Sequence, residues 1–338
     1  MKFIYQLANR DVLLIFVLGV TAWGLGWLLN QSERFSPGAS SIAIFSGIAI
    51  ALVTGMDFHG GRAVIRRLLP VSIVLLGFEL DLSAIGGTEV GVTGFAAIAA
   101  TVTMSFAVAI VGGRLLGLPM QIGAVLGAGG AICGNSAVLA VAPSLRLKHE
   151  DIAMVLAAIN LLGLAMLFVV VALSDVFQLD PIAAGIWAGS AIHAVPQSIA
   201  AGEAIGPEGL AVATAVKLSR VSLLVIVVPL FSVLGRQLHR DKAAEVGTGS
   251  WISAFKLPLF VPGFVVAVAL GNMLAPDQIS DGLGYGGRLL LLPVLAAVGL
   301  AVTRTTLMQT GRRVLLVGLL STIALSAASL AVILAIYD

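Results

Sequence analysis

Long runs of hydrophobic residues, separated by short polar connections, follow one another along the chain. A helix that crosses a bilayer needs roughly 20 predominantly apolar residues, and nine runs approach or reach that length. They occupy residues 11–29, 39–55, 66–80, 92–113, 151–173, 210–235, 252–274, 287–303 and 313–335. We therefore expect an all-α polytopic membrane protein with about nine full transmembrane helices.

Two further apolar segments, 119–145 and 181–206, carry small and polar residues at their centres. Their middles read "AGGAICGNSAVLA" (128–140) and "AGSAIHAVPQSIA" (188–200), and an ungapped alignment matches five of thirteen positions. Exposed backbone at membrane depth is tolerated only where protein buries it or where it lines a water-filled cavity. We therefore expect two interrupted elements that line a polar pocket, either re-entrant hairpins or discontinuous crossing helices. Tight packing of small residues between helices is the alternative.

The composition excludes a soluble protein. The chain is 59% hydrophobic and 11% charged, whereas soluble domains carry about 25% charged residues. We expect one transmembrane domain over residues 1–338, with 236–251 as a cytoplasmic loop and the N-terminus as a retained first helix. A single cysteine excludes an intramolecular disulfide and a cysteine-built metal site. The lipid bilayer is the expected environment, and we expect no nucleic-acid partner, no cofactor and no metal.

The distribution of positive charge favours hairpins for the two interrupted segments. Lysine and arginine accumulate on the cytoplasmic side of a membrane. With a cytoplasmic N-terminus and two hairpins, 15 of the 19 Lys and Arg residues fall inside, and Arg34 and Arg288 fall outside. This topology gives the units 119–173 and 181–235 opposite orientations, which predicts an inverted repeat in the inner (plasma) membrane. A crossing helix remains the alternative because the charge rule is a bias.

Two cations lie inside the apolar span 210–235. Lys217 and Arg220 are three residues apart and share one helix face, roughly 10 and 15 Å from the start of the span. Charges at such depth are costly and normally face the interior of the bundle, yet no acidic residue lies deep in any span. Two buried cations without a carboxylate favour an anion site. Snorkelling to an interface and pairing with hairpin carbonyls are the alternatives.

The candidate substrate site joins these cations to the interrupted segments. Its residues are Gly130, Cys133, Gly134, Asn135, Ser136, Asn160, Ser190, His193, Gln197, Lys217 and Arg220. In the repeat alignment His193 takes the place of Cys133, and Asn160 takes the place of Arg220. His193 is either a packed core residue or a group that binds an anion or carries a proton, and Cys133 is either a small apolar filler or part of the pocket.

Three ordered motifs resemble the YeiH family of sulfate exporters. They read "GAGGAICGNSAVLAVAP", "GIWAGSAIHAVPQSIAAG" and "AVKLSRVSLLV", and the likeness covers essentially the whole chain. The resemblance implies a relation to the bile acid:sodium symporters and cation/proton antiporters, with inverted repeats, a core that moves against a scaffold, and a homodimer. Where that family commonly has "IHEVAQ", this chain reads "IHAVPQ", so a carboxylate is missing at Ala194.

These features predict a secondary transporter of a small anion such as sulfate, a sulfonate or a small carboxylate, and the resemblance implies an exporter. No P-loop motif suggests ATP hydrolysis, so coupling could come from the membrane potential, from His193 or from sodium held by carbonyls. An anion channel with the same pore chemistry is the alternative. An intramembrane enzyme that uses Cys133 or His193 is disfavoured because the chain has neither H-E-x-x-H nor G-x-S-x-G, and we expect no enzyme.

Overall fold

The computed structural model describes residues 10–29, 39–55, 60–78, 88–238, 260–273, 277–303 and 311–337, and these form helices without a β-strand among them. Residues 252–259 of the span 252–274 lie outside the described residues, and a helix overlaps each predicted span. These are α2 (Arg10–Leu29), α3 (Ala39–Thr54), α4 (Gly60–Phe78), α6 (Thr88–Leu115), α9 (His149–Val176), α12 (Pro207–Ser222) with α13 (Leu224–Leu238), α15 (Phe260–Met273), α16 (Asp277–Leu300) and α18 (Arg312–Ile336). The interrupted segments form α7 (Met120–Ala131), α8 (Asn135–Val141), the short 3-10 helix η1 (Ala142–Leu145), α10 (Pro181–Ala191) and α11 (Val195–Ile205).

The predicted all-α membrane protein is confirmed, while the number of crossings stays a prediction. Five stretches of the described chain are long and apolar enough to span a bilayer: Val90–Leu115, His149–Val176, Pro207–Gly235, Gln278–Leu300 and Arg312–Ile336. The predicted cytoplasmic loop 236–251 lies almost entirely outside the described residues. The structure divides the predicted span 210–235 at Leu223, where the backbone N–H bonds the carbonyl of Arg220 in a tighter three-residue turn.

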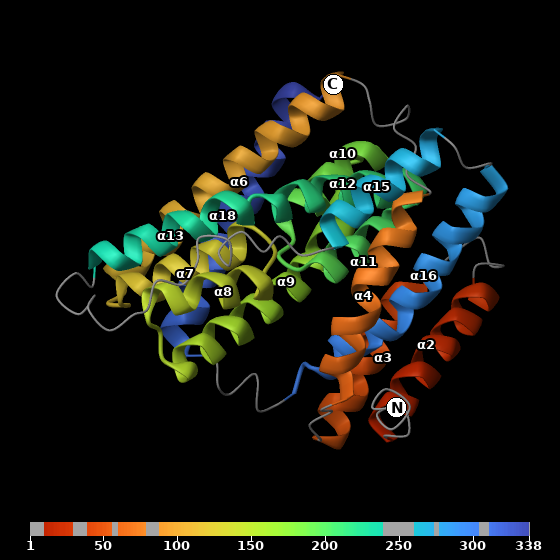
Figure 1. Ribbon diagram of the computed structural model, residues 1–338, viewed down its shortest axis with the longest axis horizontal. Helices are drawn as coiled ribbons and strands as arrows, with labels where there is room; N and C mark the ends of the chain where they lie inside the picture. Colours follow the sequence, from red (N-terminus) through yellow and green to blue (C-terminus); the bar gives the residue numbers. More distant parts are fainter. Residues whose placement is uncertain are drawn as a thin grey trace.

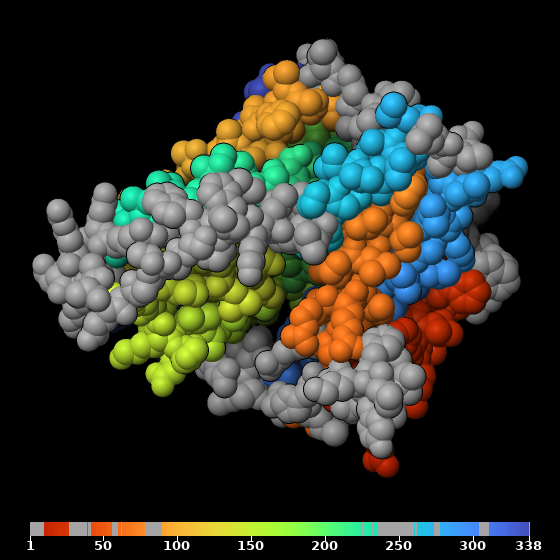
Figure 2. All heavy atoms as spheres, in the orientation of Figure 1, coloured from red at the N-terminus to blue at the C-terminus, as the bar shows by residue number. Residues whose placement is uncertain are grey.

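The helices form two groups that lie side by side (Figure 1). In one group α16 packs against α2, α3 and α4, and α15 packs against α4. In the other, α6 packs against α7 and α18, and α12 packs against α10 and α11. Contacts of α11 with α3 and α16 join the groups, as does the stack of the Phe45 and Phe168 rings, whose centroids are 4.6 Å apart. The surface is hollowed between the yellow-green part of the second group and the orange α4 of the first (Figure 2).

Close packing inside the first group depends on glycine. A Cβ on Gly299 of α16 would collide with the carbonyl oxygen of Ile44, and one on Gly47 of α3 would collide with that of Ala296. The two backbones therefore touch directly. Because lipid tails are as apolar as leucine, such van der Waals contact and not hydrophobicity holds membrane helices together. The division into two groups is the arrangement that a core and a scaffold would need, and relative motion of the groups stays a prediction.

Candidate functional site

The second interrupted segment folds back on itself as a hairpin. The Ser198 hydroxyl of α11 donates to the Ala188 carbonyl of α10 over 3.0 Å, although a continuous helix would place residues ten apart about 15 Å from each other. Both arms rest on the start of α12: a Cβ on either Gly185 or Gly202 would meet the backbone of Gly209. Of the two alternatives left open by the sequence, this segment takes the hairpin form.

The first interrupted segment folds back in the same way. A Cβ on Gly129 of α7 would lie 2.9 Å from the Val138 side chain of α8, nine residues further along the chain. The reversal depends on Gly134, whose φ of 68° and ψ of −118° belong to a region that residues with a side chain avoid. Its N–H bonds the Gly129 carbonyl over 3.0 Å and closes the turn.

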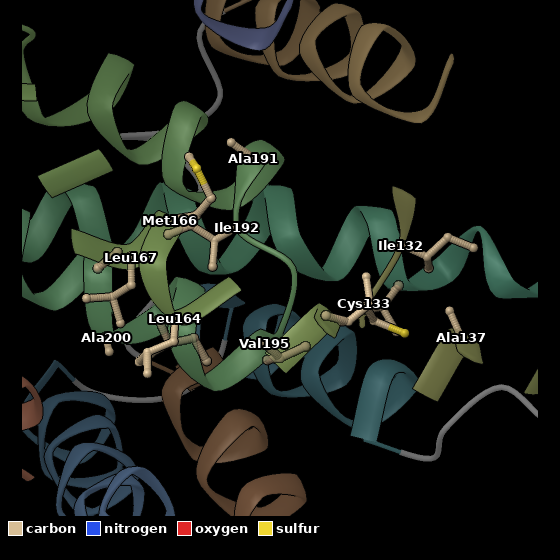
Figure 3. Packing of buried hydrophobic residues seen from close by; sticks show 14 of the residues in the cluster. Ile132, Cys133, Ala137, Leu164, Met166, Leu167, Ala191, Ile192, Val195 and Ala200 are labelled. Atoms are coloured by element: carbon tan, nitrogen blue, oxygen red, sulfur yellow. The ribbon is translucent and has the colours of Figure 1, made fainter. Parts of the chain in front are cut away.

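The two hairpin tips, residues 130–134 and 189–194, meet each other inside the second helical group. A Cβ on Gly134 would lie 3.6 Å from the Cα of Ala194 and 3.6 Å from the carbonyl carbon of His193. Apolar side chains of both tips, including Ile132 and Ile192, belong to the same buried cluster as Leu164 of α9 (Figure 3). The contact of the tips is therefore enclosed by protein.

Arg220 of α12 binds both tips at once. Its side chain is fully buried, and Nε donates to the Ala131 carbonyl over 3.0 Å while Nη2 donates to that of Gly130. On the second hairpin, Nη1 donates to the carbonyls of Gly189 and Ile192, each at 3.3 Å, and to that of Ser190. Four of these five carbonyls lie in the last turns of α7 and α10, and that of Ile192 belongs to the C-cap of α10. Carbonyls at these positions lack helical partners. One guanidinium thus caps two helices and ties the hairpins together.

Lys217, one turn earlier on α12, supports the second tip alone. Its buried ammonium donates to the Ile192 carbonyl. The two cations therefore take the third arrangement that the sequence left open, pairing with hairpin carbonyls, and do not snorkel to an interface. Whether they also attract a substrate anion is not tested by these contacts and stays a prediction.

The charges at the tips do not cancel. Among the described residues, no carboxylate interacts with Lys217 or Arg220. The C-terminal ends of α7 and α10 carry negative partial charge at the tips, while the N-terminal ends of α8 and α11 carry positive partial charge there. The helix ends together therefore do not cancel the two cations, and positive charge remains at the contact of the tips.

An amide cluster, formed by Asn135, Asn160 and Gln197, joins both hairpins to α9. The Asn135 amide donates to Asn160 Oδ1 over 2.8 Å, and the Gln197 amide donates to the Asn160 backbone carbonyl over 3.1 Å. Gly163 makes room for this arrangement, since a Cβ there would collide with Gln197 Oε1. In the repeat alignment Asn160 of α9 matches Arg220 of α12, and each of these two residues bonds both hairpins.

The remaining candidate residues lie at the edges of this centre. His193 Nε2 lies 2.9 Å from the Thr322 hydroxyl of α18, and the Ser190 hydroxyl lies 2.6 Å from that of Ser329. Cys133 is buried, and Figure 3 places its side chain beside Ala137. Ser136, at the start of α8, is exposed. The structure therefore brings the glycines, amides, histidine and cations to the tips, while Ser190 bonds away toward α18.

Sequence reasoning missed the polar face of α18 that supports the second tip. Thr322 and Ser329 make the bonds just described, and the Ser326 hydroxyl accepts from the Trp187 indole of α10 over 3.1 Å. These three residues follow helical spacing within the run 313–335. That spacing was the available signal, because it places all three hydroxyls on one face of a helix.

Comparisons with known proteins identify relatives along nearly the whole chain. The family model described as conserved hypothetical protein 698 matches residues 11–318. A UPF0324 membrane protein of Brucella melitensis is 34% identical over 94% of this chain and 88% of its own length. Similar proteins of Agrobacterium fabrum (32%, covering 90% of this chain and 88% of the relative) and Porphyromonas gingivalis (30%, 90% and 91%) carry the same UPF0324 description. No solved structure matches.

These names bear on location and not on substrate. They describe membrane proteins, in agreement with the hydrophobic composition and the five long apolar helices. None of them states a transported substance. The resemblance to sulfate exporters therefore stays a prediction.

Proposed function

This chain belongs to the conserved hypothetical protein 698 family, and we propose that it is a secondary transporter that exports a small anion across the inner (plasma) membrane. Sulfate, a sulfonate or a small carboxylate is the candidate substrate, and the protein works by alternating access, as a transporter and not as an enzyme. A homodimer anchors the helical group α2, α3, α4, α15 and α16 while the other group moves. Native mass spectrometry in mild detergent tests the dimer, and monomers alone would contradict it.

The observation that carries this proposal is the uncompensated positive charge at the hairpin tips. Lys217 and Arg220 are fully buried and bond only carbonyls among the described residues. A charge that protein dipoles do not cancel attracts a counter-ion strongly in a medium of low dielectric constant. Interrupted helices that meet within a bundle are also a common substrate site of secondary transporters. An anion is the solute that fits both features.

The course of α12 and α13 supports an inverted relation between the hairpins. Helix α12 begins beside the base of the second hairpin, at Gly209, and reaches the first tip at Arg220. The chain then continues through α13 to Gly235, where a Cβ would collide with Ser144 at the base of the first hairpin. The two hairpins thus lie against opposite halves of one helical path, as two oppositely oriented units would.

Lys217→Met tests the anion site with little risk to the fold, because the ammonium bonds a single carbonyl. Loss of one charge-assisted contact costs about 1.5–3 kcal/mol, so we expect anion affinity to fall roughly ten- to hundredfold. Stabilisation of the purified protein by sulfate, ethanesulfonate and small carboxylates, measured by thermal unfolding, checks this. Ser219→Ala, an exposed site on the same helix, is the matched control. Anion stabilisation that is the same in Lys217→Met and in the unmodified protein would contradict the site.

Transport itself is tested by counterflow in proteoliposomes with radiolabelled sulfate and sulfonates. A transporter exchanges labelled for unlabelled anion saturably. A channel with the same tips would instead conduct without counterflow, which would favour the alternative.

The proposed topology places residues 144–150 in the cytoplasm and 203–209 outside. Lys148 and Glu208 are both exposed, so single cysteines at these sites in a Cys133→Ala background should react with a membrane-impermeant thiol reagent from opposite sides. The reason is the positive-inside bias together with two hairpins that each return to their side of entry. Labelling of both sites from the same side of the membrane would contradict the inverted arrangement.

A further inference from the structure

Three buried acceptor atoms around the hairpin tips have no hydrogen-bond partner among the residues that the structure describes. They are Asn135 Oδ1, Gln197 Oε1 and His193 Nδ1. Gln197 and His193 are each 1% exposed, so water at the protein surface does not serve them. Because nearly all buried polar atoms in proteins are satisfied, three unsatisfied ones at one place indicate that something absent from the protein chain binds there.

The bonding pattern shows that two of these atoms can only accept. Gln197 uses its amide nitrogen on the Asn160 carbonyl, so the free end of the side chain is oxygen. The Thr322 hydroxyl gives its hydrogen to the Gly318 carbonyl over 2.7 Å. It must therefore accept from His193 Nε2–H, which leaves Nδ1 of a neutral ring as a bare acceptor.

All three side chains lie around a single turn of α9. Asn135 and Gln197 both bond Asn160. Three residues after Asn160 on α9, a Cβ on Gly163 would meet Gln197 Oε1 and would lie 3.1 Å from the Cβ of His193. Ser136, the neighbour of Asn135, is exposed, so the cluster lies close to open surface.

The charges of Lys217 and Arg220 limit the kind of ligand that can bind the free acceptors. Oxygen acceptors suit either a metal cation or an N–H or O–H donor. A free cation is opposed by Lys217 and Arg220, both of which interact electrostatically with His193 and leave a net positive charge at the tips. A donor group that belongs to an overall anionic or zwitterionic molecule satisfies the acceptors without this repulsion.

We infer that the transported anion carries its own hydrogen-bond donor, which the amide cluster and His193 recognise. The substrate class is a hydroxy- or amino-substituted sulfonate or carboxylate, and not fully deprotonated sulfate. In this arrangement the acidic end of the molecule responds to Lys217 and Arg220, while its O–H or N–H bonds the free acceptors. This inference rests on the proposed anion transport and specifies its substrate.

Matched ligands that differ by one hydroxyl test it. We expect 2-hydroxyethanesulfonate to bind the full-length protein in detergent about five- to tenfold more tightly than ethanesulfonate, the gain typical of one added hydrogen bond. Isothermal titration calorimetry measures both dissociation constants. In Gln197→Met, which removes one of the three acceptors, the two ligands should differ less in affinity than in the unmodified protein. Gln278→Met makes the same change at an exposed position of α16, and it should keep the preference.

The outcomes separate the two proposals. If sulfate, small carboxylates and both sulfonates neither bind nor are transported, anion transport itself is wrong. If sulfate is transported and neither sulfonate binds, anion transport stands and the inference is overturned. If both bind equally to the unmodified protein, anion transport stands, the free acceptors are satisfied by bound water, and the inference is overturned. A preference of unchanged size in Gln197→Met overturns it as well. Should Gln197→Met fail to fold, Asn135→Ala removes a second acceptor and is expected to reduce the same preference.

Discussion

Arg220→Met should destabilise the ligand-free protein strongly, because one guanidinium holds the carbonyls of both hairpin tips. The substitution leaves the carbonyls of Gly130 and Ala131 on one tip, and of Ser190 on the other, without the donor that they now have. A buried carbonyl that loses its donor costs about 1–3 kcal/mol. We expect a loss of at least this size, with a clearly lower unfolding temperature in the absence of anions.

Thermal unfolding in detergent measures this effect, and two further variants define its cause. Arg220→Lys keeps the charge, but a single ammonium cannot reproduce the planar fork of five donors, so it should recover only part of the stability. Ser219→Ala removes an exposed hydroxyl that bonds within its own helix and should have little effect. If the unfolding temperature of Arg220→Met is unchanged or raised, the buried guanidinium does not stabilise the contact between the hairpins.

The sequence located the two cations and left hairpin carbonyls open as one kind of partner, but it could not say which carbonyls. Depth within an apolar span made Lys217 and Arg220 conspicuous, and a search for buried carboxylates found none. Their actual partners are backbone carbonyls. Every residue has a carbonyl, so no side-chain pattern marks the ones that a helix end will leave free. Only the fold shows that the ends of α7 and α10 arrive beside the same face of α12.

The helices of the fold were more predictable than the contacts between them. Hydrophobic length alone predicted a helix over each apolar run, since a bilayer imposes that length. The hydroxyls of α18 were missed for a physical reason: serine and threonine in an apolar helix often bond the preceding turn of their own backbone, as Thr322 does to Gly318. A second bond of such a hydroxyl, here to His193, depends on a neighbour that is 129 positions away in the chain.

The hairpin form of the interrupted segments was favoured by charge placement and has a local cause that the sequence also displays. Gly134 supplies a backbone conformation that other residues avoid. Pro196 lies in the first turn of α11, where its missing N–H costs nothing and its fixed φ suits the start of a helix. Both residues stand at the point where the chain reverses.

Gly134→Ala should separate the two tips without disrupting any helix, because Gly134 lies in the turn between α7 and α8. At a φ of 68° and ψ of −118°, a residue with a Cβ is strained by about 1–3 kcal/mol. The new methyl group would also lie 3.3 Å from the Ile159 side chain and 3.6 Å from Ala194 Cα, which is where the tips touch. We therefore expect a lower unfolding temperature together with weaker stabilisation by anions, both measured by thermal unfolding with and without ethanesulfonate.

Gly91→Ala is the matched control for this substitution. A Cβ on Gly91 of α6 meets nothing within 4 Å, and alanine in a helix is more favourable than glycine by about 0.5–1 kcal/mol, so the control should be neutral or slightly stabilising. If Gly134→Ala instead unfolds at the same temperature as Gly91→Ala and responds equally to anions, the reversal of the chain does not depend on the glycine conformation. The contact between the tips would then not be part of the anion site, because a displaced first tip cannot leave binding at that contact unchanged.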